Sequence, residues 1–154
     1  MDEQPALEAL QPLIGEWDLE PRFSFPVPDD VAGWVAFEWM KGGRFLIERW
    51  EVSLPEAPDG IAIIGPNEDG EGYRQHYFDS RGVARVYQMG FEGGVWTLSR
   101  TTPDLSPLDF SQRFSGRFGD DGDTIEGMWE ISDDGDSWQK DFDLTYRRIS
   151  RPDA

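Results

Sequence analysis

Strict alternation of two kinds of side chain runs through the last third of the chain. Between Phe110 and Phe118, phenylalanine, Gln112 and Gly116 occupy every second position, and the positions between them carry only serine or arginine. Residues 125–131 and 138–147 repeat this two-residue period. Because successive side chains of a β-strand point to opposite faces, the period predicts strands with one buried face.

Similar aromatic and β-branched runs occupy the rest of the chain between turns. We expect strands near 15–23, 33–40, 44–52, 61–65 and 94–101 and a central hairpin at Tyr73–Met89, and the 17 Gly and 11 Pro fit many turns. Closing about ten antiparallel strands on themselves buries every apolar face and leaves no exposed edge. The sequence therefore predicts an all-β, antiparallel up-and-down barrel of about ten strands, wide enough inside for one small ligand.

One segment departs from the strand pattern. In Pro5–Ile14, leucines recur at helical spacing, and Gly15 follows as a stop signal. We predict a short N-terminal helix over about 5–14 that caps the barrel, strands within 15–148 and a frayed tail at 149–154. A chain of 154 residues is expected to be a single domain.

The composition limits the kinds of binding partner that can be expected. With 31 acidic and 14 basic residues, the formal net charge of −17 repels nucleic acids and anionic membranes, so neither is an expected partner. The absence of cysteine excludes disulfides and thiolate chemistry. The acidic start and the lack of a long apolar run argue against a signal peptide or a membrane span, and we expect a cytoplasmic protein.

The central hairpin gathers the only histidine with several basic and aromatic residues. A two-residue turn at Ser80-Arg81 would place six side chains on one face: Arg74, His76, Phe78, Val83, Arg85 and Tyr87. If that face is interior, buried cations in an acidic protein need a counter-charge, which an anionic ligand head group would supply. The alternative is that these arginines face outward and pair with surface carboxylates, and a one-residue slip decides between the two.

Two polar residues occupy positions where the strand alternation predicts an inward-facing side chain, and they extend this candidate site. Gln112 and Lys140 lie in phase with apolar neighbours such as Trp129, so they either line the cavity or lie near strand ends. The candidate ligand-binding residues are therefore Arg74, His76, Arg85, Tyr87, Gln112, Trp129 and Lys140.

The run Leu10–Trp17 and the segment Tyr77-Phe78-Asp79 resemble parts of the calycin superfamily, which includes lipocalins, fatty-acid-binding proteins and the haem-binding nitrobindins. The chain is most similar to the uncharacterised bacterial lipocalin-like domains of the DUF1579 type. This resemblance implies a ligand-binding barrel. It also implies that Trp17 packs under an arginine of the last strand, Arg147 or Arg148, and closes one end.

Other chemistries have less support. Nitrobindins carry a haem-ligating histidine near the C-terminal strands, and 138–148 contains none, so haem binding is not expected. A lone His76 makes a poor metal site, and the acidic turns at 120–123 and 133–136 lack the spacing of calcium loops. The sequence contains no catalytic signature, and we predict no catalytic residue, metal or cofactor.

Three functions remain. The first is a carrier or sensor for a small hydrophobic or amphipathic ligand, anionic or aromatic. The second is an isomerase or hydrolase that uses His76 with Tyr87 or Glu48 in the same cavity. The third is a structural domain whose barrel is packed solid by aromatic side chains, with a homodimer formed through one outer face.

Overall fold

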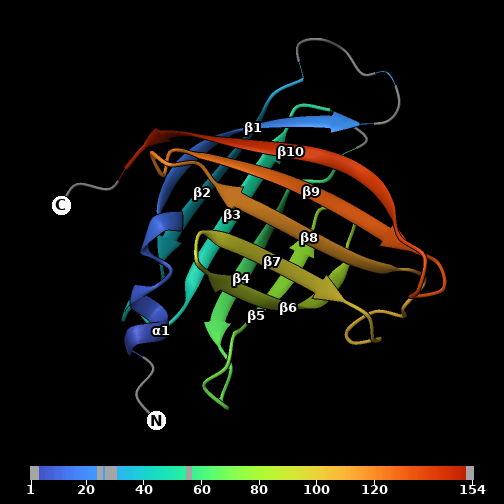
Figure 1. The fold of residues 1–154 in the computed structure, drawn as a ribbon, viewed down its shortest axis with the longest axis horizontal. Coiled ribbons are helices and arrows are strands. Elements are labelled where there is room, and N and C mark those ends of the chain that lie inside the picture. Colours follow the sequence, from blue (N-terminus) through green and yellow to red (C-terminus); the bar gives the residue numbers. More distant parts are fainter. Residues whose placement is uncertain (1–3, 24–25, 27–30, 55–56, 152–154) are drawn as a thin grey trace.

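The computed structural model describes residues 4–23, 26, 31–54 and 57–151. Within these residues ten antiparallel strands follow one another around a closed barrel, preceded by the helix α1 (Gln4–Glu8) and the 3₁₀ turn η1 (Gln11–Leu13) (Figure 1). The strands are β1 (Gly15–Phe23), β2 (Gly33–Trp39), β3 (Leu46–Val52), β4 (Gly60–Pro66), β5 (Tyr73–Asp79), β6 (Ala84–Glu92), β7 (Val95–Arg100), β8 (Ser111–Phe118), β9 (Thr124–Ser132) and β10 (Gln139–Ser150). Each strand pairs with its neighbours in sequence, and β10 pairs with β1 to close the wall. The predicted all-β up-and-down barrel is confirmed.

The N-terminal segment is less regular than predicted. The predicted short N-terminal helix is confirmed, but it does not extend over 5–14, because α1 ends at Glu8 and the chain resumes as a separate 3₁₀ turn. Pro12 has no N–H to bond the Glu8 carbonyl, and its ring would crowd that carbonyl in a continuous helix. The leucines still face the barrel, and Leu7, Leu10 and Leu13 are buried. No helix in the described residues has the length and apolar character needed to cross a membrane.

Trp17 and Arg148 close the end of the barrel beside α1. Trp17 is fully buried, and its indole Nε1 donates to the Leu13 carbonyl at 3.0 Å. The Arg148 guanidinium lies 4.1 Å from the centre of the Trp17 ring and also donates to the Ile14 carbonyl at 2.6 Å. The predicted cation–π closure is confirmed for Arg148, whereas Arg147 pairs with the exposed Glu20.

The last strand is longer than predicted. β10 continues to Ser150, two residues beyond the expected end at 148, because Ser150 pairs with Glu16 across a register shift in β1. The Ser150 hydroxyl also donates to the Glu16 carboxylate at 2.7 Å. This extra pairing fixes part of the segment that we expected to fray.

The register of the β5–β6 hairpin differs from our prediction. The loop contains three residues, Ser80 to Gly82. The Asp79 amide donates to the Val83 carbonyl at 3.0 Å, and the Gly82 amide donates to the Asp79 carbonyl at 2.9 Å. Gly82 has a φ of +86°, as a three-residue loop with a left-handed glycine requires. The predicted two-residue turn is wrong, and the difference shifts β5 by one residue against β6.

Candidate functional site

A cavity of about 630 Å³ occupies the end of the barrel opposite α1. Its wall includes residues from the connections β3–β4, β5–β6, β7–β8 and β9–β10, of which the last two lie at the right of Figure 1, away from α1. The apolar part of the wall includes Leu19, Val35, Val52, Leu98, Ile131 and Leu144. A barrel packed solid by aromatic side chains is therefore contradicted.

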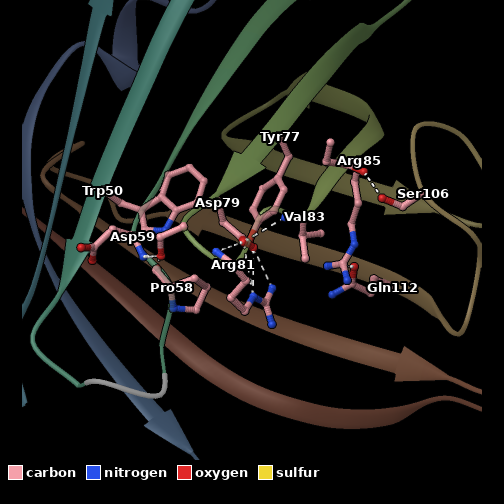
Figure 2. A network of polar contacts seen from close by, with 12 residues as sticks. Trp50, Pro58, Asp59, Tyr77, Asp79, Arg81, Val83, Arg85, Ser106 and Gln112 are labelled. Carbon is pink, nitrogen blue, oxygen red and sulfur yellow. Dashed lines mark hydrogen bonds and ion pairs between the residues drawn. The ribbon is translucent and has the colours of Figure 1, made fainter.

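Arg85 is the main cationic group of the inner wall. Its Nη1 donates to Gln112 Oε1 at 3.2 Å (Figure 2). The same oxygen accepts a 2.8 Å hydrogen bond from the Tyr87 hydroxyl. The guanidinium also lies 5.9 Å from the centre of the Tyr77 ring and 5.5 Å from that of Phe110. Among the described residues, no carboxylate forms an ion pair with Arg85. Arg85 is thus held by an amide oxygen and two aromatic rings, and its charge is not neutralised there.

The rim of the cavity contains a second arginine that is already paired. Figure 2 shows the Asp79 carboxylate between Tyr77 and Arg81; it accepts from the Tyr77 hydroxyl at 2.5 Å and from Arg81 Nη2 at 2.7 Å. Burial opposes ionisation of Asp79, but the hydrogen bonds from Arg81 and Tyr77 outweigh it and lower the pKa of the carboxyl. Burial first, and then the bond to Asp79, raise the pKa of Tyr77 above its ordinary value. Since Asp79 neutralises Arg81, Arg85 is the better placed of the two for an anionic ligand.

Trp50 forms an aromatic wall beside this rim. Its ring stacks on Tyr77 with 5.3 Å between ring centres, and its Nε1 donates to the Pro58 carbonyl at 3.0 Å. Gly60 permits this position, because a Cβ there would lie only 2.2 Å from Cζ2 of the Trp50 ring. The Ser80 amide and the Asp59 carbonyl, 2.8 Å apart, join the β3–β4 connection to the β5–β6 loop. The aromatic rim is therefore fixed from both sides.

Three polar residues occupy the buried part of the cavity wall. Glu48, Gln75 and Trp96 are 7%, 3% and 1% exposed. Glu48 Oε2, Gln75 Oε1 and Trp96 Nε1 have no hydrogen-bond partner among the described residues. Removal from water raises the pKa of Glu48 to about 8, so this carboxyl is protonated at neutral pH.

Four of the seven predicted site residues line the cavity: Arg85, Tyr87, Gln112 and Trp129. Three do not: Arg74, His76 and Lys140. The one-residue shift in the hairpin aligns Gln75 with Tyr87 and Tyr77 with Arg85, so Arg74 and His76 face outward. The strand β6 keeps the predicted phase, and only its partner β5 is reversed.

Lys140 leaves the interior because of a β-bulge in β10. Lys140 pairs with Glu130 and Phe142 pairs with Trp129, so Asp141 is an extra residue in the strand. The bulge points Asp141 into the cavity wall in place of Lys140, whose ammonium pairs with Asp143 at 3.0 Å. Burial raises the pKa of Asp141 above its ordinary value.

The predicted ligand-binding residues left out several lining residues, chiefly Glu48, Gln75, Tyr77 and Trp96, and Glu48 was considered only as a partner of His76 in an enzyme. Alternation could have found Glu48, because it is in phase with the apolar Leu46 in the same strand. Gln75 and Tyr77 were hidden by the incorrect hairpin register. No sequence pattern marked Trp96 apart from the other tryptophans.

His76 does not line the cavity. It lies on the outer face of β5 between Ile63 and Val86, so an enzyme that uses His76 inside the cavity lacks the required geometry. Among the described residues, no group of three or more His, Asp or Glu side chains is arranged to hold a metal ion.

The comparisons with known proteins support the fold. No known family model and no curated protein sequence matches the chain. Among solved structures, the chain is similar to the crystal structure of Rv2717c from M. tuberculosis, with a TM-score of 0.66 and 18% sequence identity over 95% of this chain and 98% of that chain. The likeness shows that the two proteins share a barrel fold along nearly the whole chain.

Proposed function

We propose that the protein is a lipocalin-like binding protein, similar to the uncharacterised DUF1579-type domains, that holds one small amphipathic molecule in its barrel. The ligand has an aromatic or apolar body and an anionic group placed against Arg85. The observation that carries this proposal is a cavity whose wall presents a guanidinium that is not neutralised by any described carboxylate.

The size and lining of the cavity fit such a ligand. Its volume of about 630 Å³ lies within the range of roughly 300–1,000 Å³ typical of small-molecule sites. Trp50, Tyr77, Phe110 and Trp129 give aromatic surface beside Arg85, so a planar apolar body and its charged group can be bound together. A half-buried cation that lacks a counter-ion is costly, and an anionic ligand offsets that cost.

Binding of anilinonaphthalene sulfonate, a fluorescent aromatic anion, tests the proposal. Its affinity is measured for the wild type, for Arg85→Gln and for the control Arg74→Gln, which removes the same charge from the outer face. The neutral phenylnaphthylamine, which has the same rings without the sulfonate, is measured in parallel. We expect Arg85→Gln to weaken binding of the anion by about tenfold or more, the scale of one charge-assisted hydrogen bond. Binding of the neutral probe should change little.

Equal loss in Arg85→Gln and Arg74→Gln would show that the net charge, and not the site, controls the anion. Failure of both probes to bind would contradict the proposal as a whole. Because the protein is strongly acidic, general electrostatics oppose binding of any anion. Tighter binding of the anion than of the neutral probe therefore reports a local cation.

A further inference from the structure

We propose that the buried part of the cavity is a subsite for a neutral hydroxyl group, formed by Glu48, Gln75 and Trp96. The ligand class is then an apolar or aromatic molecule with a hydroxyl directed into the barrel. This inference rests on the proposed binding function and adds the identity of the group at the buried end.

The three side chains lie along the buried wall of the cavity. Glu48 pairs with Phe37 across β2 and β3, and the Phe37 ring packs on Trp96 with 5.9 Å between ring centres. The Trp96 ring in turn packs on Tyr146 with 5.6 Å between ring centres, and Tyr146 lines the same cavity as Glu48. Gln75 enters the same cavity from β5, opposite Tyr87. Polar groups from three strands therefore line the same cavity as these aromatic rings.

The three side chains each have a polar atom without a hydrogen-bond partner among the described residues. Each of the three residues is more than nine-tenths buried, and each has a polar atom that bonds no described protein atom. Buried polar groups in folded proteins are hydrogen-bonded with few exceptions, and an unpaired one is costly. Three such atoms that line one cavity indicate a group from outside the chain as their common partner.

The donors and acceptors of the three side chains determine which chemical group they can bind. Trp96 Nε1 can only donate, and Gln75 Oε1 can only accept. A hydroxyl satisfies both, because its oxygen accepts and its proton is donated, and the protonated Glu48 carboxyl can join on either side. An anionic group does not fit here, because the ionised form of Glu48 is already disfavoured by burial. The charged end of the ligand belongs at Arg85, and the hydroxyl belongs at Glu48.

A matched pair of neutral probes tests the subsite. A naphthol and the corresponding methylnaphthalene have nearly the same shape, and only the first can hydrogen-bond. Their dissociation constants are measured near pH 6, where Glu48 is protonated, from quenching of tryptophan fluorescence. We expect the naphthol to bind about tenfold more tightly or better, the scale of satisfying a buried polar group. Equal affinities in the wild type would overturn the subsite, because water would then satisfy these groups as well as a ligand does.

Two variants locate the effect. Trp96→Phe removes the indole N–H, and Gln75→Leu removes the acceptor; each should lower the naphthol-to-methylnaphthalene preference at least severalfold. Trp138→Phe makes the same indole change on the outer face, over Arg113, and should leave the preference unchanged. A preference that persists in both cavity variants would also contradict the subsite.

The two proposals fail in distinguishable ways. Arg85-dependent binding of the anion together with equal affinity for the two neutral probes would remove only the hydroxyl subsite. Absence of binding by every probe would remove the binding function itself.

Discussion

The ionisation of Glu48 depends on its burial in the barrel interior. Its carboxyl is buried in the cavity wall, and desolvation alone raises its pKa to about 8 from an ordinary value of 4.5. In the unfolded chain this carboxyl ionises above pH 4.5, whereas in the folded protein it stays protonated to about pH 8. Between these values the folded state binds the extra proton, so the contribution of Glu48 to the free energy of unfolding falls as pH rises.

Glu48→Gln removes this proton linkage and keeps a polar side chain of similar size. We expect the stability of the variant relative to the wild type to increase between about pH 5 and about pH 8, by roughly 1.4 kcal/mol for each pH unit crossed. Urea unfolding of both proteins at several pH values measures the difference, from which titrations common to both cancel. A difference that is constant with pH would contradict a protonated Glu48.

Arg148 is the residue on which the closed end depends. It covers Trp17, and its side chain bonds the carbonyls of Pro12 and Ile14 and the carboxylate of Asp123. Arg148→Met should lower the free energy of unfolding by about 2–4 kcal/mol, because it uncovers Trp17 and removes the donor to the Pro12 and Ile14 carbonyls. Arg147→Met, one residue away, should cost no more than about 1 kcal/mol, because Arg147 forms only an exposed pair with Glu20. Equal losses in chemical denaturation would show that Arg148 does not close the barrel.

At the scale of the elements, the β5–β6 hairpin decides which side chains line the cavity. The segment Asp79–Gly82 fits either a two-residue or a three-residue loop by composition alone. The longer loop forms with Gly82 in the left-handed region, and the Asp79 side chain accepts the Arg81 amide at 2.9 Å within it. Loop length sets the register, and the register brings Gln75 and Tyr77 inside in place of Arg74 and His76.

Substitution of Gly82 tests the loop. Gly82→Ala should destabilise the protein by about 1 kcal/mol, because a side chain disfavours a φ of +86°. Gly82→Asn should cost less, because asparagine tolerates the left-handed region. Thermal or urea unfolding ranks the two variants. Equal stability of the wild type and Gly82→Ala would argue for the shorter turn.

The bulge in β10 shows a second limit of prediction from alternation. The two-residue period holds from Phe142 to Tyr146 and breaks at Asp141, where no turn residue marks the extra position. A bulge depends on how β10 pairs with β9, and alternation along a single strand does not report that pairing. Lys140 was therefore predicted to face the cavity from an alternation that holds only from Phe142 onward.

For the whole molecule, the sequence was sufficient for the architecture and for part of the site. Alternation in β8, β9 and β10, together with frequent turns, predicted a closed barrel. The resemblance at Trp17 predicted its closure by Arg147 or Arg148, and the structure has Arg148 there. Periodicity also placed Arg85, Tyr87, Gln112 and Trp129 correctly on the inner wall. The positions of Gln75, Tyr77 and Asp141 depend on loop length and a bulge, which local patterns do not determine.

The whole-molecule claim is that a ligand enters the barrel, and the tryptophans can report it directly. The chain has seven tryptophans, each with one indole N–H signal in a ¹⁵N–¹H NMR spectrum. Trp50, Trp96 and Trp129 line the cavity, whereas Trp138 lies on the outer face over Arg113. On titration with anilinonaphthalene sulfonate, we predict saturable shifts of the three cavity signals and none for Trp138. Shifts confined to Trp138, or none at all while the anion binds, would show that the ligand does not occupy the barrel.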